Sequence, residues 1–250
     1  MIPFERREAL LKVLENSKNE IVTLKEFTDI FSDVSESTIR RDLKTLADEG
    51  TIILVRGGAA KQRAGSFENS FSARNLLYPK EKELIAKSAA SLVANGEVVY
   101  IDSGSTALRI VKYLKRKDVT IVTTNASAFS ELDDASTQCR CIVVGGELLR
   151  NTASLVGPIT ESELRSIYFD KGFIGVSGFS ISAGVNTADI REAEKKKIVF
   201  SNTKDAYVVA DSSKAGITTM CKVCELQSVT IICDKLTAEL ESSGRYIIAI

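Results

Sequence analysis

The segment that organises this sequence is VSESTIRRDLKTLADEG, residues 34–50. Ser35 is a good helix N-cap because its hydroxyl can accept a hydrogen bond from a free backbone N–H of the first turn. Gly50 suits the left-handed position just past the end of a helix. Three aliphatic residues repeat at intervals of four and three, which predicts one buried face: Ile39, Leu43 and Leu46. We therefore predict a short helix between residues 35 and 50.

The opposite face of this helix is polar and positively charged. At 100° per residue, Ser37, Arg41 and Lys44 point away from the aliphatic stripe, and Arg40 lies at its flank. Helices that only face solvent often carry the same pattern, so this face alone does not distinguish a solvated surface helix from a helix that binds a partner.

The flanking segments favour a DNA-binding unit. Residues 23–26, Thr-Leu-Lys-Glu, form a capping box that opens a preceding helix, and only residues 32–34 separate the two helices. This spacing is typical of a helix-turn-helix. Downstream, residues 51–55 are rich in β-branched side chains, and residues 56–59, Arg-Gly-Gly-Ala, predict a hairpin turn followed by Lys61 and Arg63. Together these segments predict a winged helix-turn-helix.

In such a unit the second helix enters the major groove, where arginine can bond to guanine O6 and N7 and hydroxyls can meet bases or phosphates. We expect four residues to face bases: Ser37, Thr38, Arg40 and Arg41. We expect Lys44 and Arg56 to contact phosphates.

These motifs closely resemble the signature of the DeoR family of bacterial sugar-metabolism repressors. The resemblance is carried by Ser-Thr-Ile-Arg-Arg-Asp-Leu at residues 37–43, by Leu46 and Gly50, and by Gly-Gly-Ala at residues 57–59. Arg56 departs from the pattern, because the family usually has histidine there, although a cation is retained. The resemblance implies a repressor that binds operator DNA.

Composition indicates an ordinary soluble protein. The 250 residues are 44% hydrophobic and carry 33 basic and 33 acidic side chains, so no overall basic field attracts nucleic acid. No apolar run has the length of a membrane helix, and the first residues do not resemble a signal peptide, so we expect a cytoplasmic protein.

The cysteines and the absence of histidine restrict the chemistry. The five cysteines are an odd number without the spacing of a secreted disulfide scaffold, which favours reduced core thiols. An alternative is a zinc site that joins Cys221 and Cys224 to Cys139 and Cys141. The absence of histidine excludes Ser-His-Asp and Cys-His catalysis.

The chain divides into a head of residues 1–60, a linker of residues 61–79 and a second domain of residues 80–250. Residues 2–15 predict a first helix that completes the head, and the linker contains Gly65, Pro79 and several serines. From residue 97 onward, short β-rich apolar runs alternate with helical segments. Strands are predicted at 98–101, 119–122, 141–144, 173–176, 206–210, 229–233 and 246–250. Helices are predicted at 81–94, 106–114, 126–132, 159–167, 190–200 and 236–240. The pattern predicts a Rossmann-like, mostly parallel sheet with helices on both faces.

Polar loops follow several of these strands. In open α/β sheets, ligands bind at the carboxyl ends of the strands. The loops there contain Asp102, Gly104, Ser105 and Thr106, then Thr124 and Asn125, then Gly145 and Gly146, and finally Lys214. A helix N-terminus after a glycine turn suits a phosphate, so these loops predict a small anionic polyol ligand. No Gly-x-Gly-x-x-Gly follows the first strand, and no cofactor is expected.

The second domain also resembles the DeoR effector domain, which is similar to ribose-5-phosphate isomerases and binds phosphorylated sugars. The resemblance implies that Asp170, Glu192 and Lys214 occupy places like the acidic and lysine residues of those isomerases. It further implies that a phosphorylated sugar releases the repressor from its operator. We also expect a homo-oligomer, because one head offers too little contact to select an operator and two heads can bind half-sites about one helical turn apart. The alternative is a sugar-phosphate isomerase-like enzyme with an accessory N-terminal domain, because the fold alone does not decide the function. The predicted helix-turn-helix favours the regulator, since an isomerase has no use for it.

Overall fold

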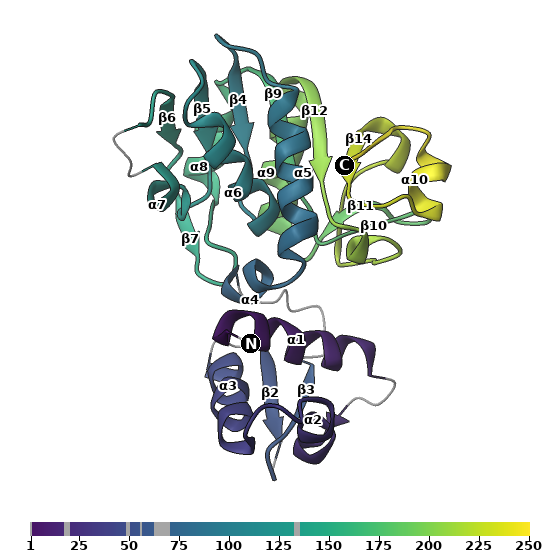
Figure 1. Cartoon of the computed structure of the whole chain (residues 1–250). Helices are drawn as coiled ribbons and strands as arrows, with labels where there is room; N and C mark the ends of the chain where they lie inside the picture. The colour runs from purple at the N-terminus through teal and green to yellow at the C-terminus, as the bar shows by residue number, and fades with distance from the viewer. Residues whose placement is uncertain (1, 18–20, 49–50, 56, 63–70, 133–135) are drawn as a thin grey trace. The chain divides into compact units, whose positions relative to one another are not determined.

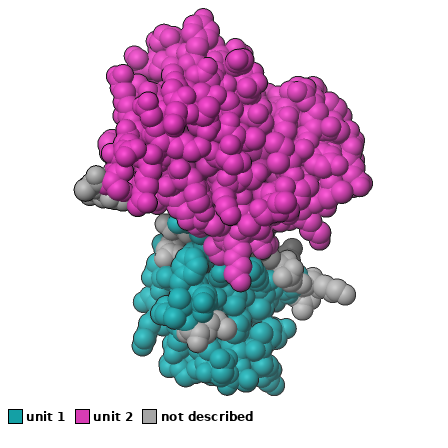
Figure 2. Space-filling model, turned by 45° about the horizontal axis from the view of Figure 1, so that its top comes forward, with its two compact units in different colours: residues 1–77 teal, residues 78–250 magenta. Residues whose placement is uncertain are grey.

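The computed structural model describes residues 2–17, 21–48, 51–55, 57–62, 71–132 and 136–250. The chain forms two compact units, residues 1–77 and residues 78–250 (Figure 2). Each unit has its own buried core. None of the helices in the described ranges is long and apolar enough to cross a membrane.

The first unit is a winged helix-turn-helix, as the sequence predicted (Figure 1). Its elements are α1 (Pro3–Asn16), β1 (Ile21–Val22), α2 (Leu24–Ile30), α3 (Glu36–Asp48), β2 (Ile52–Val55) and β3 (Ala59–Gln62). The three strands form a small antiparallel sheet in the order β1-β3-β2. Thr23 and Glu26 form the predicted capping box of α2, because Thr23 Oγ1 accepts from Glu26 N at 3.2 Å and Thr23 N donates to Glu26 Oε2 at 2.6 Å.

The core of this unit follows the predicted aliphatic stripes. One face of each helix and one side chain of β2 are buried together: Leu10, Leu11, Leu14, Phe27, Phe31, Ile39, Leu43, Leu46 and Ile52. Burial of such side chains supplies about 1.5–3 kcal/mol each, which is why three short helices hold together. The polar face of α3 is left at the surface.

The residues predicted as a linker, 61–79, carry regular secondary structure at both ends. Lys61 and Gln62 belong to β3, where they pair with Ile53 and Ile52 of β2. The later part contains a short helix, α4 (Phe71–Leu76), and α5 (Pro79–Ser91) begins at the predicted linker's last residue. Gly50, Arg56 and Arg63 lie outside the described residues.

The second unit is built on a seven-stranded sheet in which every pair is parallel, in the order β15-β14-β12-β9-β4-β5-β6. Its strands are β4 (Val98–Ile101), β5 (Thr120–Thr123), β6 (Arg140–Val143), β9 (Phe169–Gly175), β12 (Thr203–Val209), β14 (Thr230–Cys233) and β15 (Tyr246–Ile248). The helices around it are α5, α6 (Ser105–Leu114), α7 (Ala128–Leu132), α8 (Pro158–Arg165), α9 (Ile190–Ser201) and α10 (Ala238–Ser243). The predicted open parallel α/β sheet is confirmed.

Helices cover both faces of this sheet, with α5 and α6 in front and α8 and α9 behind in Figure 1. Tyr100 and Val122 pack with Leu164 of α8 and Ile198 and Val199 of α9. The neighbouring strand residues, which alternation points the other way, are buried as well, including Val99, Ile101 and Ile121. Burial on both faces explains why these strands read as continuous apolar runs.

Five further strands were not predicted from the sequence. A hairpin of β7 (Glu147–Leu149) and β8 (Ser154–Val156) stands apart from the main sheet. A second small sheet contains β10 (Gly178–Ser180), β11 (Gly184–Thr187) and β13 (Cys221–Cys224). Two 3₁₀ turns complete the unit, η1 (Ser212–Lys214) and η2 (Leu226–Ser228).

Candidate functional sites

The surface of α3 presents the side chains that the sequence analysis assigned to DNA. Ser37, Arg40, Arg41 and Lys44 are exposed, and Thr38 is half-buried. Ser35 caps the helix: its Oγ accepts from Thr38 N at 3.3 Å and lies 2.8 Å from Thr38 Oγ1. Arg56, the remaining predicted DNA contact, lies outside the described residues.

A buried ion pair anchors α3 from behind. Asp42 lies on the inner face of α3 and accepts a hydrogen bond from Arg6 Nε of α1. Both side chains are mostly buried, and the Asp42 carboxylate raises the pKa of Arg6. The pair ties α1 to the helix that carries the exposed cations, which fixes the direction in which that face points.

In the second unit, the first two predicted loops meet at the carboxyl edge of the sheet. Asp102 to Thr106 follow β4, Thr124 and Asn125 follow β5, and all of them are buried. The Tyr100 hydroxyl on β4 lies 2.8 Å from Thr124 Oγ1 and donates to Asp102 Oδ1 at 3.2 Å. Gly104 has φ +145 and is the N-cap residue of α6, so the turn uses a backbone conformation that other residues rarely adopt.

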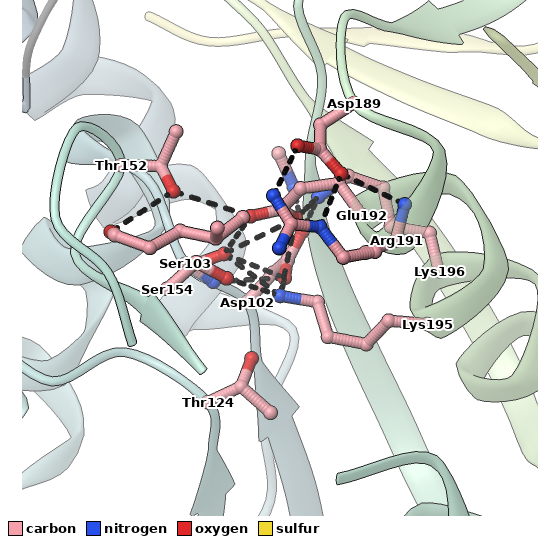
Figure 3. Close-up of polar contacts among 12 residues, drawn as sticks. Asp102, Ser103, Thr124, Thr152, Ser154, Asp189, Arg191, Glu192, Lys195 and Lys196 are labelled. Carbon is pink, nitrogen blue, oxygen red and sulfur yellow. Dashed lines mark hydrogen bonds and ion pairs between the residues drawn. The ribbon is translucent and has the colours of Figure 1, made fainter. Parts of the chain in front are cut away.

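Two lysines of α9, Lys195 and Lys196, meet the Asp102 carboxylate, as Figure 3 shows. Lys196 Nζ is 2.6 Å from Asp102 Oδ2 and 2.9 Å from Glu192 Oε2. Lys195 Nζ is 3.4 Å from Asp102 Oδ1 and 3.1 Å from Glu192 Oε2, and it donates to Ser154 Oγ at 2.6 Å. Two carboxylates and two ammonium groups therefore form a buried network without net charge.

The pKa shifts in this network follow from its pairing. Burial alone would raise the pKa of Glu192, but Lys195 and Lys196 outweigh it and hold that pKa below its usual value. Burial would lower the pKa of Lys196, but Asp102 and Glu192 outweigh it and raise that pKa. Glu192 and Lys196 therefore stay charged across the neutral range.

Asp102 is fully engaged by the protein itself. Its Oδ1 accepts from Ser103 N at 2.8 Å, and its Oδ2 accepts from Gly175 N at 3.1 Å besides Lys196. Its side chain has no exposed surface. The carboxylate therefore orders the loops around it, and its oxygens are not open to a sugar hydroxyl in this structure.

Asn125 differs from its neighbours because one polar atom lacks a partner. Its Oδ1 accepts from Ser127 N at 2.9 Å, whereas its buried Nδ2 has no hydrogen-bond partner among the described residues. Buried amide nitrogens are almost always satisfied, so an unpaired one marks a place for a water or a ligand.

The other predicted residues are more dispersed. Gly146 is required for packing, because a Cβ there would lie 1.9 Å from Thr160 Oγ1, and Gly145 O accepts from the same hydroxyl at 2.7 Å. Lys214 ends η1 after β12 and is half-buried. Its side chain makes no hydrogen bond or ion pair with the residues that the structure describes.

Asp170 does not join the other predicted residues. It lies near the start of β9, where Oδ2 accepts from Val98 N at 2.9 Å, at the amino edge of the sheet. The sequence analysis grouped it with the effector residues through the isomerase resemblance alone, and a position at the opposite end of a strand is not visible from such a match.

Sequence reasoning missed Lys195, Lys196, Ser154, Thr152 and Arg191. Thr152 Oγ1 contacts Glu192 Oε1 at 3.4 Å (Figure 3), and Arg191 Nη1 donates to Glu147 Oε1 at 2.7 Å. The lysines stand in a run of charges, Glu-Lys-Lys-Lys at residues 194–197, that looks solvent-exposed. The available signal was their spacing of three and four residues from Glu192, which allows ion pairs on one helix face.

The alternative zinc site lacks structural support. Cys139 lies just before β6 and Cys141 lies within it, whereas Cys221 and Cys224 belong to β13 in a different sheet. Within the described ranges, no group of three or more acidic, cysteine or histidine side chains is placed to hold a metal ion. Burial raises the pKa of Cys141 to about 11, as expected for a protonated thiol in the core.

A winged helix-turn-helix with an exposed basic face, joined to an α/β unit with a polar edge, defines a DNA-binding regulator with a sensor domain. Residues 6–63 match the DeoR-like helix-turn-helix domain, and residues 78–235 match the DeoR C-terminal sensor domain. The chain belongs to the DeoR family of transcriptional regulators, which confirms the resemblance seen in the sequence.

Individual proteins similar to this chain are regulators. The uncharacterised helix-turn-helix-type transcriptional regulator YgbI of Escherichia coli is 33% identical over 86% of this chain and 83% of its own length. The lactose phosphotransferase system repressor of Staphylococcus epidermidis is 28% identical over 93% of this chain and 92% of its own length. Among solved structures, ribose 5-phosphate isomerase A of Methanocaldococcus jannaschii is 20% identical, with a TM-score of 0.38 over 54% of this chain and 53% of its own. The two relatives found by sequence are named as a transcriptional regulator and a repressor.

Proposed function

We propose that this regulator represses a sugar-utilisation operon and is released from its operator by a phosphorylated sugar. The exposed face of α3 is proposed to enter the major groove, with Ser37, Thr38 and Arg41 at base edges and Lys44 at phosphates. Arg56 is proposed as a further phosphate contact. The lactose system repressor among the relatives supports the repressor assignment.

One observation carries the effector half of this proposal: the buried, unpaired Nδ2 of Asn125 at the carboxyl edge of the sheet. This donor lies beside Thr124 and at the same edge as the turn of Gly104, Ser105 and Thr106. A sugar hydroxyl or phosphate oxygen would satisfy it, and the first turn of α6 would favour a negative charge.

The charge balance of the edge indicates which cation would meet the phosphate. Lys195 and Lys196 are already neutralised by Asp102 and Glu192, whereas Lys214 is unpaired within the described residues. Lys214 follows β12, and β12 lies two strand spacings, about 10 Å, from β4 because β9 runs between them. We propose Lys214 as one end of the site. Asp102 and Glu192 then order the loops around the site. A role of Gly145 and Gly146 at the ligand stays a prediction from their loop position, and a role of Asp170 stays a prediction from the resemblance.

We further propose a homo-oligomer that acts in the cytoplasm, where its DNA is. A single head offers one recognition helix, and operator selection generally requires two half-sites about one helical turn apart.

The effector proposal is tested by thermal unfolding of the full chain with a panel of phosphosugars and the matching unphosphorylated sugars. A ligand that binds only the native state raises the midpoint by mass action. Asn125→Asp keeps the oxygen that accepts from Ser127 N but replaces the free donor with a negative charge. We expect a phosphosugar to raise the midpoint of the wild type and of the exposed control Asn95→Asp, but not that of Asn125→Asp. An equal shift in all three proteins would place the ligand elsewhere.

A further inference from the structure

Arg40 and Arg41 are adjacent on α3, but their surroundings differ. Arg40 Nε and Nη2 lie 2.9 and 2.8 Å from the same oxygen, Glu36 Oε1, one helical turn earlier. The guanidinium of Arg41 makes no hydrogen bond or ion pair with any described residue. Arg40 is therefore engaged within the protein, and the guanidinium of Arg41 is available to contact DNA.

The third nitrogen of Arg40 lies against the wing. Gly58, in the turn between β2 and β3, has φ +80, and a Cβ on it would be 2.8 Å from Arg40 Nη1 and 3.3 Å from Leu24 Cδ2. Gly58 N donates to Val55 O at 3.2 Å and closes that turn. Arg40 therefore reaches from the second turn of α3 to the backbone of the wing, and Gly58 leaves room for it.

We propose that Arg40 is a positioning residue that sets the wing against α3, and that Arg41 is the arginine that reads a base. Bidentate recognition of guanine needs two free guanidinium N–H groups, and those of Arg41 are free. If Arg40 turned to a base, it would leave the Glu36 carboxylate uncompensated on a surface that faces DNA phosphates. The inference rests on the proposed role of α3 and refines it.

The ion pair alone would not hold Arg40 in place. The side chains of Arg40 and Glu36 are 51% and 57% exposed, and exposed ion pairs contribute little to stability because solvent screens them. Two further effects favour the position of Arg40 beside the wing. Its departure would leave the Glu36 carboxylate unpaired, and it would lose the contact with Gly58. This combination predicts that Glu36 and Arg40 act on DNA binding as a coupled pair, while Arg41 acts independently.

The test is selection from a randomised double-stranded DNA library, followed by affinity measurements on the selected operator and its single-base variants. The proteins are the full chain, Arg40→Gln, its matched neighbour Arg41→Gln, Glu36→Gln and the double variant Glu36→Gln/Arg40→Gln. No sugar is present, so a failure of the effector proposal does not affect the result. All changed side chains are exposed, which keeps the folds comparable.

We expect Arg41→Gln to lower affinity for the preferred operator about 5- to 150-fold and to remove base preference at one position of each half-site. Arg40→Gln should lower affinity about two- to fivefold on every sequence alike, and by less than about twofold when Glu36 is already Gln. Loss of preference at a single base pair in Arg40→Gln would overturn the proposal. So would an unchanged cost of Arg40→Gln in the Glu36→Gln protein.

Discussion

The most informative residues are four buried charges that the protein pairs with one another. The sequence indicated Asp102 and Glu192 only as effector-binding residues, one from its place after a strand and the other from the family resemblance, and not as partners in an ion-pair network. Lys195 and Lys196 were not predicted, because a run of lysines indicates a solvated helix face unless the carboxylates opposite it are known. Pairing across loops and helices distant in sequence is set by tertiary structure, and a single sequence does not encode it locally.

Loss of Asp102 should destabilise the second unit. In Asp102→Ala, Lys195 and Lys196 would share only the Glu192 carboxylate in a buried network, and breaking such a network costs about 3–5 kcal/mol. Asp102→Asn, which keeps the acceptor for Ser103 N, should cost less. Urea unfolding of the full chain measures both, with the exposed Asp118→Ala as a control. A cost below about 1 kcal/mol for Asp102→Ala would show that the network contributes little.

The paired Glu192 also predicts an acid dependence. Its pKa is lowered in the folded state, so the unfolded chain binds a proton first as the pH falls below about 4.3. The stabilisation it gives is therefore full above that pH and is lost as the pH falls toward the folded pKa. The pKa of Lys196 is raised, so its contribution is full below about pH 10.4 and is lost only above it. Between pH 3 and 6, Glu192→Gln should lose less stability than the wild type. Parallel curves of unfolding free energy against pH for the two proteins would contradict a lowered pKa of Glu192.

At the scale of elements, the sequence predicted the wing hairpin and the helices and parallel strands of the second unit, but not α4 or the small sheets of the second unit. Strand 98–101 and helix 106–114 agree with β4 and α6 within one residue, because caps, glycine turns and long apolar runs mark them. The strands β10, β11 and β13 contain glycine, polar residues and cysteine with few aliphatic side chains, and β7 begins with an exposed glutamate. Such segments pair because the larger sheet and α9 hold them in position, which is a tertiary effect.

The ion pair between Arg6 of α1 and Asp42 of α3 should stabilise the whole of helix α3. Asp42→Ala leaves Arg6 without its largely buried partner, and a hydrogen bond to a charged group contributes about 1.5–3 kcal/mol. We expect faster hydrogen exchange of the α3 amides, unchanged exchange in α9, and weaker DNA binding without a change in base preference. Unchanged exchange in α3 would mean that the aliphatic core alone holds this helix.

At the scale of the whole molecule, the sequence predicted two units and their order, and the family comparison supports the class of protein. Residues 6–63 and 78–235 match the two DeoR domains, close to the predicted head and second domain. The exact limits of the linker and the oligomeric state remain predictions. Neither is encoded in local sequence patterns. The limits of a linker depend on which tertiary contacts form, and the oligomeric state depends on a surface that meets a second copy of the chain.

The oligomer proposal has its own test. If two heads engage half-sites together, sedimentation of the full chain should give at least a dimer at the concentrations where it binds its selected operator. Binding should then require both half-sites, so a DNA with one half-site deleted should bind much more weakly. A monomer that binds the half-site as tightly as the full operator would exclude this arrangement.

The central claim is that a phosphorylated sugar at the carboxyl edge of the sheet sets the affinity of this regulator for its operator. A ligand can shift DNA binding only through different affinities for the free and DNA-bound states. The most direct measurement is fluorescence anisotropy of labelled operator DNA, titrated with the phosphosugar that stabilises the protein, for wild type, Asn125→Asp and Lys214→Ala. We predict that the sugar releases DNA from the wild type, while both variants bind DNA with wild-type affinity and do not release it. Release from the variants at the wild-type sugar concentration, or no release from the wild type, would contradict the account.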